Sequence, residues 1–374
     1  MINKERLLAE FLELVQIDSP TGSEKQIADS LKTRLGALGF EVSEDKAGEI
    51  LGGNCGNVYG YLKGNILQAP ILLLSAHMDT VQPGTGIKPV LKQGVITSVG
   101  NTILGADDKS GIAPIMEALR TVKEQAIPHG DIQVVFCIAE EGGVNGSRNL
   151  DRVRLKADLG YVLDSGGKPG EIILEAPGQD RLKVTFKGKA SHAGVAPEEG
   201  INAILAAAKA IASVRQGRID EETTANVGTI HGGRATNIIA DTVEITAESR
   251  SRNLAKMEQQ TAYMCETFKR CAEELGAEAI LELRRAYDPY VISKEAKVSL
   301  LAAEAAKKAG FTPVFRSSGG GSDANHLNCY GIPCAVLGTG MKKSHTFEEF
   351  IEEEDLYNSA RLVLEIIKGV SVMK

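Results

Sequence analysis

Histidines and acidic residues stand in five short polar motifs, each at the point where an apolar run of the chain ends. The motifs are Ala-His77-Met-Asp79-Thr, Gly-Ala-Asp107-Asp108-Lys, Ala-Glu140-Glu141-Gly, Leu-Asp164-Ser and Lys-Ser-His345-Thr. Carboxylates and imidazoles suit zinc, cobalt or manganese, and ligands from five separate strand ends or loops can hold two cations. The residue types therefore predict a hydrolytic site with two divalent metal ions.

The first two motifs also have structural explanations. His77 could be a histidine at a surface strand end, and Asp107 with Asp108 could serve the positive end of a helix dipole. On an extended segment, however, residues i and i+2 face the same side, so Asp79 could hold the second nitrogen of the His77 ring. One carboxylate of the Asp107-Asp108 pair could bridge two cations while the other serves the helix.

The remaining motifs are ambiguous when taken singly. Asp164 could be a turn acid before Ser-Gly-Gly, and His345 could be a loop histidine. Glu140 and Glu141 are harder to explain structurally, because like charges at a buried strand end repel unless a cation or a proton relieves them. One of these two acids can bind a metal while its neighbour takes a proton from metal-bound water. The assembly of all five motifs indicates a catalytic site.

The composition is that of an ordinary globular protein with an acidic balance. The chain has 374 residues, 43% of them hydrophobic and 24% charged, and is long enough for two domains with cores of their own. Lys and Arg number 42 against 49 Asp and Glu, which gives a formal net charge of -7. This charge argues against a general basic surface for nucleic acid or for an anionic membrane.

The N-terminal sequence and the cysteines favour the cytoplasm. The chain begins with charges of both signs and an amphipathic pattern instead of the apolar stretch of a signal peptide, and no run approaches a membrane span. The cysteines are scattered without a CxxC pair; they are Cys55, Cys137, Cys265, Cys271, Cys329 and Cys334. Such usage is typical of a reducing compartment, so we expect a cytoplasmic protein.

Helical and strand patterns alternate along the chain, which predicts an α/β fold. Apolar residues recur at helical spacing from Leu7 to Val15, and Ser23 with Gln26 predicts a capping box for a second helix that ends at Gly39. Nearly continuous apolar runs predict strands buried on both faces at 71–75, 132–139, 159–163 and 334–337. His77, Glu140, Asp164 and the loop before His345 lie just beyond the carboxyl ends of such strands, where ligand sites of open α/β sheets collect.

The pattern changes between residues 179 and 288. It predicts a strand at 181–187, a helix at 201–214, strands at 224–230 and 243–249, a helix at 254–275 and a strand at 279–284. This β-α-β-β-α-β order predicts a complete ferredoxin-like unit. Four ligand motifs precede the unit and the fifth follows it. We therefore expect a catalytic domain made of residues 1–178 and 289–374, with residues 179–288 inserted as a second domain.

Taken in order, the motifs resemble the family of co-catalytic zinc peptidases, which includes peptidase T, glutamate carboxypeptidase, acetylornithine deacetylase and aminoacylase. The resemblance covers essentially the whole chain and extends to Ser191-His192-Ala-Gly and Gly-Gly-Gly-Ser322-Asp323. The forms His-Met-Asp-Thr and Gly-Ala-Asp-Asp-Lys are similar to the tripeptidase branch, peptidase T. The implied fold is a catalytic domain with a mixed sheet flanked by helices, plus an inserted ferredoxin-like lid or dimerisation domain.

The resemblance assigns two metal sites that share one carboxylate. Asp107 would bridge the two cations. Glu141 and His345 would complete one site, and His77 and Asp164 would complete the other. The cations implied are zinc, and cobalt or manganese also suits these ligand types.

Two further acids receive catalytic roles from the same resemblance. Glu140 would be the general base that takes a proton from a water bridging the cations, and Asp79 would orient the metal-binding histidine. Members of the family also tend to have a cis peptide bond at the position of Asp107-Asp108. The implied reaction is the hydrolysis of a short peptide, as by a tripeptide aminopeptidase.

The inserted unit resembles the lid or dimerisation domain of the family, so a homodimer through this domain is expected. Its His192 resembles the histidine that polarises the scissile carbonyl, often in the active site of the neighbouring subunit. Asn237 and Arg250 resemble residues that hold the carboxylate or the carbonyl of the substrate, and an arginine fork suits a carboxylate.

Substrate choice stays open because the chain departs from peptidase T around two histidines. It has His192-Ala193-Gly194 where peptidase T has His-Pro-Gly, and its His345 stands in a different local context. The nearer alternatives are a deacylase of N-acyl amino acids, a dipeptidase or a carboxypeptidase on the same scaffold. The farther one is a metal-stabilised binding protein without catalysis, although a spare base beside a ligand has no structural purpose.

Overall fold

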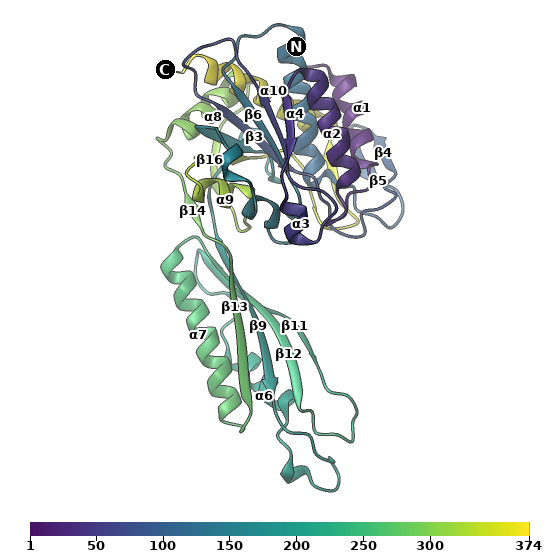
Figure 1. Cartoon of the computed structure of the whole chain (residues 1–374), viewed down its shortest axis with the longest axis vertical. Coiled ribbons are helices and arrows are strands. Elements are labelled where there is room, and N and C mark those ends of the chain that lie inside the picture. Colours follow the sequence, from purple (N-terminus) through teal and green to yellow (C-terminus); the bar gives the residue numbers. More distant parts are fainter. Residues whose placement is uncertain (374) are drawn as a thin grey trace. The chain divides into compact units, whose positions relative to one another are not determined.

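The chain divides into two compact units. The computed structural model describes residues 1–373. The first unit contains Met1–Glu175, Val291–Ser318 and the chain from Ser322 onward, and the second contains Ala176–Tyr290 with Gly319–Gly321. The first unit is thus built from both ends of the chain, as the purple and yellow segments of Figure 1 show.

A mixed sheet forms the centre of the first unit. In sheet order its strands are β1 (Glu41–Glu44), β2 (Val58–Leu62), β6 (Ile132–Cys137), β3 (Leu72–His77), β7 (Leu159–Val162), β16 (Cys334–Leu337), β8 (Glu171–Ala176) and β14 (Tyr290–Val291), with β15 (Val314–Ser317) paired to β8. Neighbours from β6 to β16 run parallel, whereas β2 and β8 pair antiparallel with them. The parallel strands are buried along their whole length, which explains their continuous apolar sequences.

Helices flank this sheet. They are α1 (Lys4–Val15), α2 (Lys25–Leu38), α3 (Ala47–Leu51), α4 (Ala106–Glu124), α5 (Asn145–Arg148), α8 (Lys297–Lys308), α9 (Asp323–Cys329) and α10 (Glu353–Ser371), with a short 3-10 turn at Arg152–Arg154. The central helix α4 packs against α1, α2, α10 and strand β3, so its start lies beside the end of that strand. A separate three-stranded sheet comprises β17 (Phe350–Glu352), β5 (Val95–Ser98) and β4 (Pro89–Lys92).

The second unit has the β-α-β-β-α-β order expected from its sequence. Its elements are β9 (Gly178–Lys187), a 3-10 turn (Pro197–Glu199), α6 (Ala203–Ser213), β10 (Gly217–Arg218), β11 (Thr223–Gly232), β12 (Thr242–Ser251), α7 (Leu254–Glu273) and β13 (Glu278–Tyr287). The sheet order is β10-β11-β12-β9-β13, and all pairs are antiparallel. Inward side chains of the strands and of both helices form one core, in which Phe186 and Phe268 meet edge to face.

The expected α/β class with a mixed, helix-flanked sheet is confirmed, but one local prediction is wrong. The second helix ends at Leu38, directly before the predicted end at Gly39, and Gly39 itself has a left-handed conformation. The helix begins at Lys25, however, without the expected Ser23-Gln26 capping box. The residue before the helix is Glu24, whose carboxylate turns inward and accepts the N–H groups of Gly22 and Ala139. At the start of this helix, the Glu24 side chain makes a long-range hydrogen bond with Ala139 instead of a local cap.

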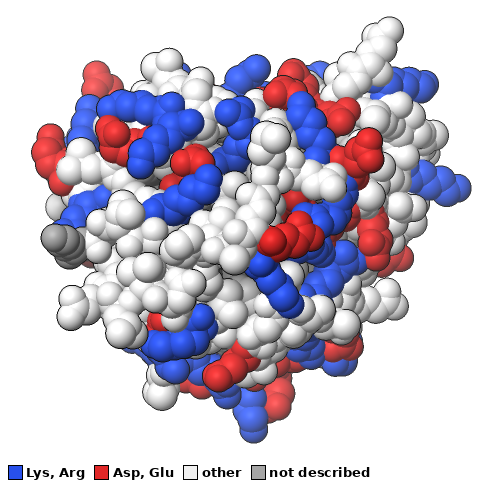
Figure 2. Space-filling view, turned by 90° about the horizontal axis from the view of Figure 1, so that it is seen from above, with Lys and Arg blue, Asp and Glu red and all other residues white. Residues whose placement is uncertain are grey.

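Charges of both signs are interspersed on the face of the molecule in Figure 2. Lys and Arg alternate there with Asp and Glu and with uncharged side chains, so this face offers no continuous basic surface. Within residues 1–373, every helix is too short or too polar to cross a membrane.

Candidate active site

The side chains predicted to bind metal converge at the carboxyl edge of the mixed sheet. Two groups offer ligand atoms that all lie within 4.8 Å of one another: His77, Asp107 and Asp164 form one, and Asp107, Glu141 and His345 form the other. The residues come from the ends of β3, β6 and β7, from the start of α4 and from the loop before β17. Asp107 belongs to both groups, so the two possible cation positions share its carboxylate.

The two oxygens of Asp107 face two different imidazoles. Oδ1 lies 3.0 Å from His77 Nε2, and Oδ2 lies 3.3 Å from His345 Nε2. His345 Nε2 is also 3.0 Å from a carboxylate oxygen of Glu141, and His77 Nε2 is 4.0 Å from Asp164 Oδ1. A carboxylate placed in this way can bridge two cations about 3.5–4 Å apart, and the nitrogen and oxygen donors fit zinc, cobalt or manganese.

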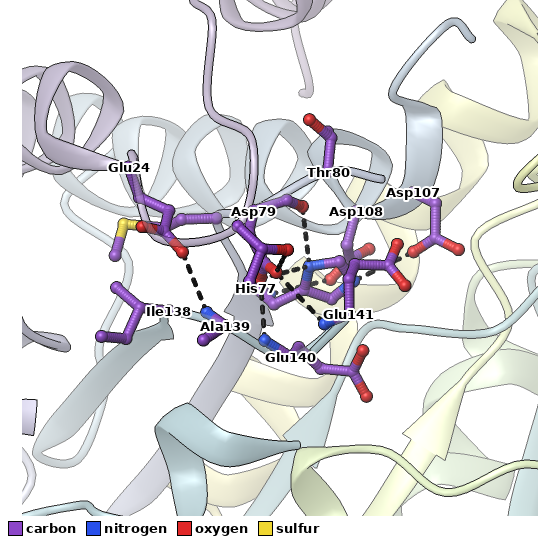
Figure 3. Close-up of polar contacts among 12 residues, drawn as sticks. Glu24, His77, Asp79, Thr80, Asp107, Asp108, Ile138, Ala139, Glu140 and Glu141 are labelled. Carbon is purple, nitrogen blue, oxygen red and sulfur yellow. Dashed lines mark hydrogen bonds and ion pairs between the residues drawn. The ribbon is translucent and has the colours of Figure 1, made fainter. Parts of the chain in front are cut away.

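The backbone of Asp79 orients the His77 ring. His77 Nδ1 lies 3.0 Å from the carbonyl oxygen of Asp79 and 3.4 Å from its carboxylate, which leaves Nε2 directed at the other ligands. The Asp79 carboxylate accepts the N–H groups of Glu140 (2.9 Å) and Glu141 (3.1 Å) and the hydroxyl of Thr21 (2.6 Å), as Figure 3 shows in part. Asp79 therefore positions two acids as well as the histidine.

Burial, hydrogen bonds and neighbouring charges shift several pKa values in this site. Burial, followed by the charge of Asp164, raises the pKa of Glu140 well above its ordinary value, and burial followed by Asp107 does the same for Asp164. Hydrogen bonds with Asp107 and Glu141 raise the pKa of His345 to about 10. The shifts of the two acids come first from burial and then from neighbouring negative charge, which a divalent cation in each ligand group would offset.

Asp108 adjoins the bridging carboxylate but belongs to neither ligand group. Its side chain is buried, and its Oδ2 accepts the backbone N–H of His77 at 3.2 Å. The peptide bond between Asp107 and Asp108 is cis, as the family resemblance implied. Both residues have non-helical φ and ψ, so the regular part of α4 begins after them. Through its hydrogen bond with the His77 N–H, the Asp108 side chain instead contacts the end of strand β3.

Two buried charged residues that the sequence analysis missed hold the surrounding loops. Glu349 accepts the N–H groups of Leu104 and Gly105 at 2.8 Å and of Asp107 at 3.0 Å. Lys109, which is 1% exposed, donates to the Ser19 hydroxyl and to the Met78 carbonyl at 2.7 Å, and burial lowers its pKa to about 8. An adjacent acid pair at Glu348-Glu349 was the one sequence signal for the first of these residues.

Two of the predicted substrate-binding residues lie together in the second unit. His192 forms an isolated β-bridge with Ile238, and the N–H of Ala193 donates to the Asn237 carbonyl at 3.0 Å. Both predicted side chains are exposed. His192 lies in the loop after β9 and Asn237 in the loop between β11 and β12, both at the Lys187 end of β9.

Arg250 lies toward the opposite end of the same sheet. Strand β12 pairs Thr242 with Lys187 and Arg250 with Gln179, so the strand length separates Arg250 from the His192 loops by about 27 Å. The Arg250 guanidinium donates to both carboxylate oxygens of Glu248, at 2.8 and 3.0 Å. The second unit thus offers two separate polar regions rather than one.

Comparison with known proteins adds a family and close relatives. A family model described as peptidase family M20/M25/M40 matches residues 73–369. The chain is 44% identical to the uncharacterized protein YqjE of Bacillus subtilis, with 98% of this chain and 99% of the relative covered.

Two solved structures resemble the chain over its length. One is the aminopeptidase PepT of Bacillus cereus, at 47% identity, a TM-score of 0.90 and 99% coverage of both chains. The other is a tripeptidase of Staphylococcus aureus, at 42% identity, a TM-score of 0.95 and 100% coverage of both chains.

The shared carboxylate leads to a prediction about metal content. Asp107→Ala should reduce the bound zinc from about two ions to below about one, because both ligand groups lose a member, whereas Asp164→Ala should retain about one. Equilibrium dialysis followed by elemental mass spectrometry measures this content. The exposed surface acid variant Asp29→Ala is the control and should bind as the unaltered protein does. Equal zinc content in Asp107→Ala and Asp29→Ala would contradict the prediction.

Proposed function

We propose that this chain, which belongs to peptidase family M20/M25/M40, is a metal-dependent tripeptidase that removes the N-terminal residue of its substrate. One observation carries the proposal: two ligand groups share Asp107, and a buried acid, Glu140, lies near their members Asp164 and His77. The full-length similarity to an aminopeptidase and to a tripeptidase supports the choice of substrate.

The cofactor that we propose is a pair of divalent cations, with zinc, cobalt and manganese all suited to the donor atoms. When bound, such a pair supplies Lewis acidity and lowers the pKa of water. His77 and Asp164 would hold one cation, Glu141 and His345 the other, and Asp107 both.

Glu140 is the general base in this proposal. Its backbone N–H is fixed by Asp79, and its carboxylate lies near enough to Asp164 and His77 for their charges to shift its pKa. From this place the carboxylate takes a proton from the water that attacks the scissile carbonyl. It then gives the proton to the amine that leaves.

Replacing Glu140 and replacing Glu141 should have different effects on turnover and on metal content. Glu140→Gln should lower kcat by about 100- to 10,000-fold and keep its metal, since a base is lost but no ligand. Glu141→Ala should lose metal from one ligand group as well as activity. Steady-state rates and metal content of the same samples distinguish the two, with exposed Glu304→Ala as the control. Turnover at the unaltered level in Glu140→Gln would refute the assignment.

The substrate proposal is tested by a mixed panel of dipeptides, tripeptides, tetrapeptides and N-acyl amino acids. After chelation and return of zinc, cobalt or manganese, we expect loss of the N-terminal residue from tripeptides at least about tenfold faster than any other cleavage. Mass spectrometry of the products gives these rates. Cleavage confined to acyl amino acids would keep the metal site and overturn the substrate. No metal-restored hydrolysis at all would favour a binding protein.

We also propose a homodimer in which the second unit of one copy completes the site of the other. A tripeptide spans about 10 Å, which is less than the separation of about 27 Å between the His192 loops and Arg250 of one copy. One substrate molecule therefore cannot contact His192 and Arg250 of the same copy. Exposed apolar side chains gather at the His192 end; they are Val195, Ile204, Leu205, Ile230 and Ile238. Such a cluster is typical of a protein contact.

Mixed dimers test whether His192 acts across this contact. His192→Ala and Glu140→Gln should each be nearly inactive alone. Co-expressed in equal amounts, they should recover about one quarter of the unaltered activity, because half of the dimers would hold one intact site. Rates per mole of protein measure the recovery. If His192 serves its own chain, mixing the two variants will restore nothing.

A cytoplasmic location also remains our proposal. All six cysteines are free thiols, and three of those in the first unit, Cys55, Cys137 and Cys334, are buried. Free thiols persist in a reducing compartment, which supports the cytoplasm.

A further inference from the structure

The 19–24 segment, Ser-Pro-Thr-Gly-Ser-Glu, is the last part of the link between α1 and α2 and precedes the range that the family model matches. It runs beside the end of β3. The carbonyl of Ser19 accepts the N–H of Thr80 at 2.9 Å, Pro20 forms a β-bridge with Thr80, and the Ser19 hydroxyl accepts a hydrogen bond from Lys109. These contacts fix the segment against the strand that ends in His77.

Glu24 connects this segment to the loop after β6. The side chain is fully buried, and its Oε1 accepts the N–H of Ala139 at 3.1 Å and that of Gly22 at 2.9 Å. Ala139 has a φ of +49°, a left-handed conformation that is unfavourable for a residue with a Cβ. Burying a carboxylate is also costly. The strained residue, Ala139, directly precedes Glu140, and the buried carboxylate of Glu24 accepts its N–H.

The hydrogen bonds continue along the same loop. The N–H groups of Ala139, Glu140 and Glu141 each donate to a buried carboxylate, the first to Glu24 and the next two to Asp79 (Figure 3). Thr21, also in the 19–24 segment, donates its hydroxyl to Asp79 at 2.6 Å. Three successive N–H groups are thereby fixed in direction, and so are the two side chains that leave this stretch of backbone.

We propose that Glu24 is a positioning residue of the active site: it holds the left-handed turn at Ala139 and thereby aims Glu140 and Glu141. Thr21 contributes to the same alignment through Asp79. The role of Glu140 rests on the proposed function, whereas the alignment of Glu141 rests on the ligand groups alone. A simple role for Glu24 in capping α2 does not account for these contacts, because its side chain makes no cap hydrogen bond.

The first test compares two buried glutamates. Glu24→Ala should lower kcat for a tripeptide by about 10- to 100-fold per mole of folded protein, with KM changed less than about threefold, since misplacing a catalytic group slows the reaction steeply. Glu24→Gln, whose amide oxygen can still accept the Ala139 N–H, should recover most of this loss. Glu10 is buried and pairs with Arg34 and Arg120 among the helices. Glu10→Ala is the control: it should lower the melting temperature and leave kcat within about twofold.

The second test does not need a substrate. Cobalt in place of zinc reports the geometry of its ligands by visible absorption, so Glu24→Ala should alter the cobalt spectrum and Glu10→Ala should not. Thr21 is exposed, so the Thr21→Val variant should fold normally and can replace Glu24→Ala if that variant does not fold. We expect Thr21→Val to alter the cobalt spectrum and kcat in the same direction as Glu24→Ala, but less. Spectra and kcat unchanged in Thr21→Val and Glu24→Ala, or no recovery in Glu24→Gln, would overturn the proposal. If the unaltered protein does not cleave tripeptides, the proposed function is wrong, but the cobalt spectra still test whether Glu24 aligns Glu141.

Discussion

Negative charge crowded at one buried edge of the sheet is the constraint on which the first unit depends. Two carboxylates about 4 Å apart repel by about 4 kcal/mol at an effective dielectric constant of about 20, so several cannot be ionised together without compensation. The protein compensates in two ways. The carboxylates of the two ligand groups face imidazole nitrogens, whereas Glu24, Asp79 and Glu349 accept backbone N–H groups.

The second kind of compensation joins the electrostatics of the site to the shape of its loops. Glu24 and Asp79 fix the turn after β6, and Glu349 fixes the turn before α4. Each carboxylate would be destabilised by its neighbours without the N–H groups, and each loop would have unpaired N–H groups without the carboxylate. This arrangement depends on the parallel strands, because β3 and β6 end at the same level of the sheet, where His77 pairs with Cys137.

Local patterns in the sequence were sufficient to predict most elements and the five polar motifs that supply the two ligand groups. A strand expected at 334–337 is found there. Which acid of each adjacent pair belongs to a ligand group was implied by the family resemblance and not by the local pattern. Long-range partners could not be found in this way. Glu24 and Glu349 bind backbone 115 and 242 residues away, and the mistaken cap at Ser23 has the same cause. The separation of His192 from Arg250 depends on strand pairing, which residue types alone do not fix.

The order of the ligands along the chain has a consequence for protein synthesis. His345 meets Glu141 across 204 residues, with the whole second unit encoded between them. At about 5–20 residues per second, a ribosome needs at least about 10 s to travel this distance. A growing chain therefore carries an incomplete pair of ligand groups until His345 has been synthesised. Fragments released before residue 345 lack this imidazole, so the ligand group that contains Glu141 is completed only in chains that extend past it.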